Sequence, residues 1–452
     1  MSAPIRFFSF ILHLKRYREM SMQGKRVAFY TLGCKLNFAE TASIARQFEA
    51  EGYRQVPFDE EADVYFINSC TVTHHADRKC RSAIRRAIRK NPGAFVAVGG
   101  CYAQVNAAEI SQIEGVDAIL GSREKFRLFQ LFGDFAKQPA PDIRVESARR
   151  APTFEPAWSL TDRTRSFLKV QDGCDYFCSY CTIPLARGAN RSASIAETLK
   201  AAGEIAARGK KEIVLTGINI GEFGREKGES FLNLIRELDR LEGIERYRIS
   251  SIEPNLLSDE IIEQVHESRK FLPHFHIPLQ SGSDEILSAM RRRYDTRLFA
   301  DRVAKIRSLM PLAGIGVDVI TGFPGETEAH MEQQDRFLHE VDFSYLHVFS
   351  FSERPQTRAA RMKGKITPRE IEARSHRLHE LSERKHRLFM ERNLGTRNRV
   401  LFETREKGSV TGWTENYLKF ATTDPGATPG SIKTVSLDAL DGEERLTGNL
   451  TP

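Results

Sequence analysis

Three cysteines stand within one short segment, CDYFCSYC at residues 174–181, with the spacing C-x3-C-x2-C. Three thiols this close cannot all pair with one another, and structural zinc sites use two separated pairs or add a histidine, which this segment lacks. Three thiolates from one loop fit three corners of a cubane [4Fe–4S] cluster and leave one iron open to a non-protein ligand. The segment therefore predicts an iron–sulfur site.

The cysteine segment follows the first of several short apolar runs that alternate with helical patterns. We expect strands at Ser166–Gly173, Glu212–Asn219, Arg246–Pro254, His274–Gln280, Gly314–Gly325 and Tyr345–Ser352, with helices such as Ala196–Arg208 and Asn233–Leu241 between them. This alternation predicts an α/β fold with a parallel sheet, and six strands suit a partial (βα)6 barrel. In such folds the functional groups gather at the carboxyl ends of the strands.

A similar alternation precedes this region. Its expected helices are Glu40–Glu51 and Ala76–Lys90, and its expected strands are Arg26–Leu32, Asp63–Asn68 and Phe95–Gly100. One cysteine comes just after each strand, namely Cys34, Cys70 and Cys101. Parallel strands end at a common edge, so we expect these three thiols to meet there. Cys80 lies inside a basic helical pattern, and we interpret it as a non-ligand.

Two further stretches mark domain borders. Residues 138–163 are rich in proline and charge with little periodicity, which is typical of a linker. Thr367, Pro368 and Glu370 form a capping box that predicts the start of a long helix, and Gly395 is a plausible stop. Short strands joined by glycine and proline turns follow, which predicts a small all-β barrel.

Composition excludes several classes of protein. The chain has 452 residues, 40% hydrophobic and 28% charged, as expected for a folded soluble protein of two to four domains. Seven cysteines in a chain of this length argue against a secreted disulfide scaffold and favour the cytoplasm. No apolar run approaches the roughly 20 residues that cross a bilayer. The net charge of +7 permits a nucleic-acid partner without demonstrating one.

The combination resembles the radical S-adenosylmethionine (radical-SAM) methylthiotransferase family from about Arg26 onward. The motifs that carry the resemblance are TLGCKLNFAET, NSCTVTHHADRKCR, GGCYAQ, VQDGCDYFCSYCTIPLARGANRS, SSIEP, HIPLQSGSDEIL, GFPGET and FSFSERPQTRAA. The KLN after Cys34 is similar to the branch that modifies threonylcarbamoyladenosine at position 37 of tRNA. Gln356, where members often have glycine, departs from the pattern, and the family suggests no role for the N-terminal extension.

The resemblance implies a domain order, which we adopt as an expectation. Residues 24–140 form a methylthiotransferase domain, 141–163 a linker, 164–392 the radical-SAM core and 393–452 a TRAM-like RNA-binding module. From the sequence itself, we expect residues 1–23 to be a poorly ordered extension, or translation to start at Met20 or Met22. The resemblance also implies two [4Fe–4S] clusters and SAM. Cys174, Cys178 and Cys181 would hold the cluster that cleaves SAM, whereas Cys34, Cys70 and Cys101 would hold an auxiliary cluster that carries the sulfur.

The implied reaction replaces hydrogen by a methylthio group at C2 of adenine, which acid–base chemistry cannot do because this C–H bond is strong and unactivated. A radical generated at a cluster can do so, and the protein positions the reactants. One SAM would methylate the sulfur and a second would yield the radical, so both clusters must face one pocket. Polar residues at the strand ends are expected to bind the cofactor there: Thr216, Gly217, Asn219, Ser251, Glu253, Gln280, Ser281 and Asp318. We interpret His274, His276 and His347 as ordinary strand residues.

Basic and aromatic residues suggest where tRNA binds. Arg78, Arg81, Arg85 and Arg89 form a stripe on one predicted helix, and Arg291–Arg293 is a second basic patch. Arg187 and Arg191 follow the cysteine segment and could meet phosphate beside the pocket. In the C-terminal module, Trp413, Tyr417 and Lys419 form the mixture that stacks on bases and holds phosphate, although core packing explains such aromatics equally well.

Several alternatives stay open from the sequence. The substrate could instead be isopentenyladenosine in tRNA or a ribosomal protein aspartate, and a non-catalytic metal-cluster RNA-binding protein is a different class. As partners we expect the anticodon stem-loop of tRNA, an electron donor such as flavodoxin or ferredoxin, and a sulfur source. We expect no membrane association and a monomer. The sequence does not indicate which tRNAs are modified.

Overall fold

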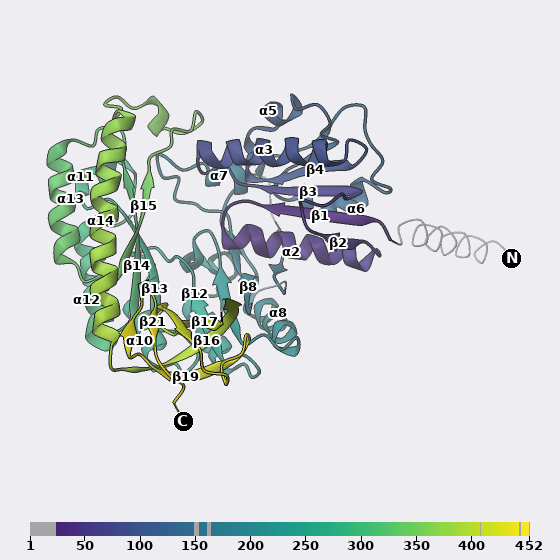
Figure 1. The fold of residues 1–452 in the computed structure, drawn as a ribbon. Helices are drawn as coiled ribbons and strands as arrows, with labels where there is room; N and C mark the ends of the chain where they lie inside the picture. The colour runs from purple at the N-terminus through teal and green to yellow at the C-terminus, as the bar shows by residue number, and fades with distance from the viewer. Residues whose placement is uncertain (1–23, 149–152, 161–163, 407, 443, 452) are drawn as a thin grey trace. The chain divides into compact units, whose positions relative to one another are not determined.

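The computed structural model describes residues 24–148, 153–160, 164–406, 408–442 and 444–451 (Figure 1). The extension predicted at residues 1–23 lies outside the described residues. The chain divides into two compact units, called here the N-terminal unit (residues 1–159 and 182–188) and the C-terminal unit (residues 160–181 and 189–452). Within the described part, no helix has the length and apolar character needed to cross a membrane.

The N-terminal unit is built on a parallel sheet with the strand order β2-β1-β3-β4-β5-β6. Its strands are β1 (Arg26–Thr31), β2 (Arg54–Val56), β3 (Val64–Ser69), β4 (Phe95–Gly100), β5 (Ala118–Leu120) and β6 (Asp142–Arg144), and β7 (Ala157–Trp158) lies apart from them. Its helices are α2 (Lys35–Ala50), α3 (His74–Lys90), α4 (Cys101–Val105), α5 (Ala107–Ser111), η1 (Glu124–Arg127), α6 (Leu128–Leu131) and α7 (Ile183–Arg187).

Both faces of this sheet are buried, which is why its strands appear in the sequence as continuous apolar runs. Tyr65 of β3 packs in one core cluster with Ile84 of α3. Its neighbour Phe66 points to the other face and packs with Phe48 of α2. Figure 1 accordingly shows α3 and α2 on opposite sides of the sheet.

The segment predicted to be a linker contributes two short strands. Strand β6 extends the N-terminal sheet by pairing parallel to β5. In β7, the carbonyl of Trp158 accepts a 2.7 Å hydrogen bond from Arg46 of α2, whose guanidinium lies 3.9 Å from the centre of the indole ring. Strands of two or three residues are too short to produce a periodic pattern, so the sequence could not reveal them.

The C-terminal unit contains the six predicted parallel strands. They are β8 (Arg165–Lys169), β11 (Glu212–Thr216), β12 (Arg246–Ile249), β13 (His274–Gln280), β14 (Gly314–Thr321) and β15 (Tyr345–Ser350). Strands β8, β11 and β12 pair in one sheet and β13, β14 and β15 in another. Isolated parallel bridges, Tyr247 to Phe271 and Ser251 to His276, join the two sheets.

Helices and short elements connect these strands. The helices are α8 (Ile195–Ala207), η3 (Ile220–Glu222), η4 (Arg225–Lys227), α9 (Phe231–Arg240), α10 (Asp259–Glu267), α11 (Asp284–Ala289), α12 (Thr296–Leu309), α13 (Glu328–Glu340), η5 (Ala359–Arg361) and α14 (Pro368–Asn393), and a small ribbon pairs β9 (Gln171–Asp172) with β10 (Arg191–Ser192). Helix α14 begins as predicted, with Thr367 and Glu370 closing the capping box.

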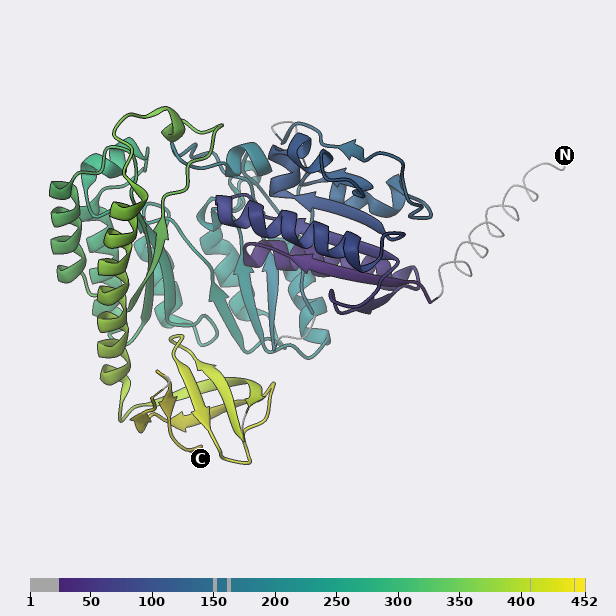
Figure 2. The same cartoon turned by 45° about the horizontal axis from the view of Figure 1, so that its top comes forward.

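A curled six-stranded sheet follows α14 (Figure 2). Its order is β19-β16-β17-β18-β21-β20, from β16 (Arg397–Glu406), β17 (Ser409–Thr414), β18 (Lys419–Thr422), β19 (Ile432–Ser436), β20 (Ala439–Leu440) and β21 (Leu446–Thr447). An isolated bridge joins Val435 to Leu450, so the chain end returns to the first strand of the sheet. Phe389 and Met390 of α14 pack into its core.

The turn between β17 and β18 packs against the parallel strands of the same unit. Arg248 of β12 donates to the carbonyls of Thr414 (3.3 Å) and Glu415 (3.1 Å). Gly314 at the start of β14 has no space for a side chain, because a Cβ there would lie 2.2 Å from the carbonyl oxygen of Asn416. The C-terminal sheet therefore packs directly on the parallel strands β12 and β14.

Candidate cofactor and substrate sites

Three cysteines of the N-terminal unit follow strands that are neighbours in the sheet. Cys34 follows β1, Cys70 follows β3 and Cys101 follows β4, and β3 lies between the other two strands. Burial and the charge of Cys101 raise the pKa of the Cys70 thiol to about 12, and Cys34 adds to this effect. Cys34 and Cys101 thus affect the titration of Cys70, and the grouping of these three thiols as ligands stays a prediction.

Glycines make room for these thiols. Gly33 has φ +99°, and a Cβ on it would lie 2.9 Å from Sγ of Cys70. Gly100 has φ +97°, and a Cβ on it would lie 2.6 Å from Oδ1 of Asn68. Both positions combine a left-handed backbone with close packing, so only glycine fits before Cys34 and Cys101.

A buried ionic network lies beside these cysteines, and the sequence did not reveal it. Glu40 of α2 receives Nζ of Lys125 at 2.5 Å and both terminal nitrogens of Arg187 at 2.9 and 3.0 Å. Asn37 accepts from Arg187 at 2.6 Å, and Asn68 accepts from Lys125 at 3.2 Å. The Lys125 and Glu40 side chains are fully buried and that of Arg187 is 1% exposed.

Two basic side chains of the network, Lys125 and Arg187, both contact the carboxylate of Glu40. Burial lowers the pKa of Lys125, as does the charge of Arg187, whereas Glu40 opposes this effect. Burial raises the pKa of the Cys101 thiol, and the charges of Arg187 and Lys125 act against that rise. The nearby cations therefore favour the thiolate form that a metal cluster needs.

Cys80 sits in a different environment from the other three cysteines of this unit. It is fully buried in a hydrophobic core cluster with Ile84 and Tyr65. Burial raises the pKa of its thiol, and the charges of Asp77 and Cys70 add to this effect. Cys80 packs in the core, and its assignment as a non-ligand stays a prediction.

In the C-terminal unit, Cys174, Cys178 and Cys181 lie on the loop that follows β9, and all three are partly exposed. Burial, together with the charges of Cys181 and Cys178, raises the pKa of the Cys174 thiol to about 12. The amide of Tyr176 donates to Sγ of Cys174 at 3.4 Å. Three thiols on one loop thus share a small volume, which fits a cluster with three protein ligands.

Arg292 connects this loop to Glu253, one of the predicted site residues. Its guanidinium donates to Sγ of Cys178 at 3.1 Å and forms an ion pair with Glu253. Burial raises the pKa of Glu253, and the charge of Arg292 opposes that effect. The Arg292 side chain is only 4% exposed, so it does not belong to a surface basic patch as the sequence suggested.

Three of the predicted cofactor-binding residues lie at the end of β11 and in the loop after it. Oε1 of Gln171 accepts from the amides of Ile218 and Asn219, both at 2.8 Å, and a Cβ on Gly217 would lie 2.8 Å from the same oxygen. Thr216 is buried and donates to the carbonyl of Leu168. Asn219 is 2% exposed, and within the described residues neither side-chain atom makes a hydrogen bond of standard length. A buried amide of this kind offers a donor and an acceptor to a ligand.

The remaining predicted residues lie on or just after β12 to β14. Ser251 bridges to His276, and Ser281 is buried and accepts from the amide of Ser283 at 3.2 Å. Gln280 has φ +70° beside a β-bulge and accepts from the Tyr180 hydroxyl at 3.0 Å. Of these residues, Gln280 contacts the cysteine loop, through Tyr180.

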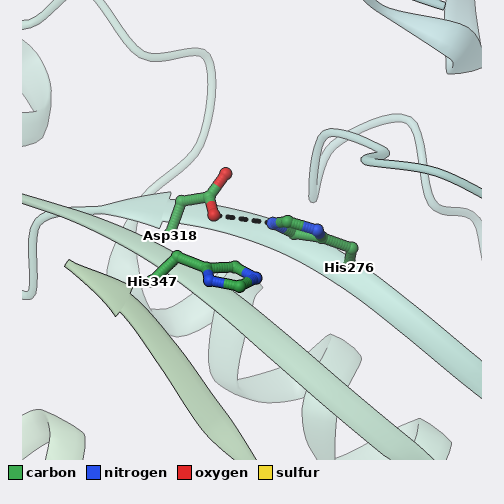
Figure 3. Close-up of side chains that lie close together, drawn as sticks. All are labelled: His276, Asp318 and His347. Carbon is green, nitrogen blue, oxygen red and sulfur yellow. Dashed lines mark hydrogen bonds and ion pairs between the residues drawn. The ribbon is translucent and has the colours of Figure 1, made fainter. Parts of the chain in front are cut away.

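Asp318 is the eighth predicted site residue, and it contacts a histidine that we had interpreted as an ordinary strand residue. Its Oδ1 lies 2.6 Å from Nε2 of His276, and His347 lies alongside, with its ring centre 5.1 Å from that of His276 (Figure 3). One ligand-type atom from each of the three residues lies within 4.8 Å of the others. The sequence separates them widely, and only the pairing of β13, β14 and β15 brings them together.

The structure corrects two predicted RNA contacts. Arg187 is buried in the ionic network described above, and Arg191 is 7% exposed and donates to Asp172 at 2.9 Å. Arginines that are buried and already paired are not presented to phosphate from solvent. The basic character of the segment after Cys181 reflects internal ion pairs instead.

The three predicted RNA contacts in the C-terminal sheet differ from one another. Trp413 and Tyr417 stack on each other with ring centres 4.5 Å apart, and Tyr417 also lies 4.6 Å from His274. Both line a cavity of about 310 Å³ together with Tyr345. Lys419 is exposed on β18. Part of the aromatic surface is therefore used in packing, and base stacking stays a prediction.

Two family models match separate parts of the chain. The family model described as "Uncharacterized protein family UPF0004" matches residues 26–121, and the Radical SAM superfamily model matches residues 168–338.

Among curated relatives, the threonylcarbamoyladenosine tRNA methylthiotransferase MtaB of Bacillus subtilis is 43% identical over 407 residues, which cover 87% of this chain and 89% of the relative. The enzyme of the same name from Aquifex aeolicus is 38% identical, over 83% of this chain and 92% of the relative. The tRNA-2-methylthio-N(6)-dimethylallyladenosine synthase of Oleidesulfovibrio alaskensis is 32% identical, over 86% of each chain.

Among solved structures, the radical S-adenosylmethionine methyltransferase TsrM from Kitasatospora setae has a TM-score of 0.54 at 15% identity, over 75% of this chain and 77% of that chain. At this identity the likeness concerns the fold alone.

Proposed function

The chain belongs to the radical-SAM methylthiotransferase family, and from this premise we propose that it transfers a methylthio group to C2 of N6-threonylcarbamoyladenosine at position 37 of tRNA. Identity of 43% and 38% to relatives named for that substrate, against 32% to a relative named for the dimethylallyl substrate, supports this choice. The KLN motif after Cys34 points to the same branch.

Membership in the radical-SAM superfamily implies SAM and one [4Fe–4S] cluster. Cys174, Cys178 and Cys181 would hold this cluster, which supplies, with SAM, a carbon-centred radical that no side chain can generate. Arg292 would stabilise the Cys178 thiolate by the hydrogen bond it already makes. Glu253 holds Arg292 in place, and the buried amide of Asn219 is available to a bound cofactor.

We further propose a second cluster on Cys34, Cys70 and Cys101. The observation that supports it is that these thiols follow three neighbouring strands and lie beside two buried basic side chains, Lys125 and Arg187, whose charges oppose the rise in the pKa of the Cys101 thiol. A cluster with three thiolate ligands would place negative charge beside these basic side chains.

The reaction requires partners that the chain itself does not contain. We propose that flavodoxin or ferredoxin supplies electrons, that a separate sulfur source serves the cluster on Cys34, Cys70 and Cys101, and that the protein acts on the anticodon stem-loop as a cytoplasmic monomer.

The proposed function is tested by nucleoside mass spectrometry of tRNA from a strain that lacks the gene, complemented with the wild type or with Cys178→Ala. We expect threonylcarbamoyladenosine to remain unmodified at C2 in the deletion strain and in the variant, and to be methylthiolated with the wild type. Loss of methylthiolated isopentenyladenosine instead would overturn the substrate assignment. Unchanged tRNA, combined with zinc rather than about eight irons per chain after anaerobic purification, would indicate a non-catalytic protein.

A further inference from the structure

His276, Asp318 and His347 form a polar layer across three adjacent strands, β13, β14 and β15 (Figure 3). Asp318 and His347 are direct partners in the β14–β15 register, and His276 reaches Asp318 with Nε2 to Oδ1 at 2.6 Å. Sheet geometry therefore fixes all three side chains on one face.

This face differs from the opposite one. The intervening residues Ile277, Val317 and Val319 are fully buried and apolar, and Figures 1 and 2 show α11 to α14 gathered on one side of these strands. The side chains of His276 and Asp318 are 18% and 17% exposed, and His347 is exposed. A polar layer that solvent reaches, on the face away from the apolar core, is accessible to a solute.

The layer lies between the start of strands β13 and β15, which aromatic residues cover, and the cysteine loop. Two residues earlier on β13 and β15, His274 bonds the Tyr345 hydroxyl at 2.9 Å, and Tyr417 of the C-terminal sheet covers His274. In the other direction along β13, Gln280 accepts from the hydroxyl of Tyr180, a residue of the cysteine loop, at 3.0 Å. A molecule that reacts near the cysteine loop can thus extend a substituent toward this layer.

We propose that the His276–Asp318–His347 layer binds the polar group on N6 of the substrate base. The inference rests on the proposed function. The threonylcarbamoyl group has urea N–H donors, a carbonyl, a hydroxyl and a carboxylate. Imidazole N–H groups can donate to its oxygens, and the Asp318 carboxylate can accept from its N–H or O–H groups.

The geometry of adenine agrees with this placement. The reacting carbon C2 and the carbon that carries N6 flank the same ring nitrogen, N1, so a base can present C2 to the cysteine end of the strands while its N6 group extends along them. A dimethylallyl group has no hydrogen-bonding atoms and would exclude solvent from the layer without offering a hydrogen bond in return. A site built for hydrogen bonds rejects such an analogue strongly.

The test compares three anticodon stem-loops, which carry threonylcarbamoyladenosine, isopentenyladenosine or adenosine at position 37. Their Kd values are measured by fluorescence anisotropy with the full-length, cluster-reconstituted protein. The variants are His347→Phe, Asp318→Asn and His347→Gln, which keeps a donor. His376→Phe is the matched control, because His376 is an exposed histidine on α14 whose side chain is 75% exposed.

We expect His347→Phe and Asp318→Asn to weaken binding of the threonylcarbamoyl stem-loop roughly tenfold for each lost charged hydrogen bond, and to leave the adenosine stem-loop unchanged. His347→Gln should recover part of the loss, and His376→Phe should match the wild type. The ratio of the two Kd values is the decisive readout, since misfolding would weaken both stem-loops together.

Two results would overturn the inference. One is an unchanged Kd ratio in the variants while the wild type still methylthiolates threonylcarbamoyladenosine. The other is about one equivalent of zinc or manganese in the wild type that His276→Ala removes, which would make the layer a metal site. If the wild type discriminates among the stem-loops but modifies none at C2, the proposed function fails while this binding site stands.

Discussion

The two groups of cysteines are built in different ways and lie in different electrostatic surroundings. Cys174, Cys178 and Cys181 share one partly exposed loop, where Arg292 contacts Cys178 and is paired with Glu253. Cys34, Cys70 and Cys101 come from three strand ends beside a buried network in which Lys125 and Arg187 both contact Glu40. The first site is defined by local spacing, whereas the second depends on sheet topology.

The loop site is the one whose loss should have the largest effect. We expect Cys174→Ala, Cys178→Ala and Cys181→Ala each to abolish SAM cleavage, because a cubane with two protein thiolates rarely persists. The measurement is 5′-deoxyadenosine production under reducing, anaerobic conditions. The three other proposed ligands should still hold iron, about half of the wild-type amount. Near wild-type cleavage by any of these variants would refute the ligand assignment.

The strand-end site should fail differently. Replacing Cys34, Cys70 or Cys101 by serine should halve the iron content and stop methylthiolation, yet allow some uncoupled SAM cleavage. Cys80→Ser is the matched control in the same unit, since Cys80 packs in the hydrophobic core. It should lower the thermal stability but retain both clusters. Iron loss in Cys80→Ser without unfolding would mean that the ligand set was chosen wrongly.

The contrast between local spacing and sheet topology also explains which features could be predicted from the sequence. The spacing of residues 174–181 is visible without a structure, and the alternation of apolar runs and helices predicted the parallel strands. Cys34, Cys70 and Cys101 could be grouped because all three follow strands. The Lys125–Glu40–Arg187 network joins residues 85 and 147 positions apart, and no local pattern encodes such a contact. Arg187 was therefore mistaken for a surface residue, and the proximity of His276 to His347 was missed for the same reason.

Charge substitutions can separate the electrostatic role of the buried network from its structural role. Arg187→Met or Lys125→Met removes one cation, and we expect the reduction potential of the second cluster to fall by roughly 60 mV or more, a factor of ten for one electron. Glu40→Gln removes the carboxylate and should raise the potential. Electron paramagnetic resonance during a redox titration measures both shifts.

The critical outcome is that the reduction potential shifts in opposite directions when a cation is removed and when Glu40 is replaced. Breaking a buried ion pair costs about 3–5 kcal/mol, so all three variants should unfold at lower temperature than the wild type. Arg127→Met provides a control, because Arg127 is exposed on η1 beside Lys125 in the sequence. If all the buried variants shifted the potential in one direction, or none did, the network would have only a structural role.

The smallest effect that we expect is on tRNA binding, and it comes from exposed arginines and not from the buried Lys125 and Arg187. Arg78, Arg85 and Arg89 are exposed on α3, whereas Arg81 of the same helix is partly buried and donates to Glu109 at 2.6 Å. Exposed arginines that contact phosphate release counterions, so tRNA affinity should fall with salt at a log–log slope of about −0.7 to −0.9 per contact.

We therefore expect Arg85→Glu and Arg89→Glu to weaken tRNA binding a few-fold and to flatten the salt slope by about one each, as should Lys419→Glu on β18. Arg240→Glu is the matched control, since Arg240 is an exposed arginine at the end of α9, its side chain 73% exposed. Slopes are obtained from anisotropy titrations at several salt concentrations. A slope that responds to Arg240→Glu as strongly as to Arg85→Glu would show that net charge, and not a defined surface on α3, governs tRNA binding. If none of these variants changes the salt slope, the RNA-binding surface does not include α3 or β18.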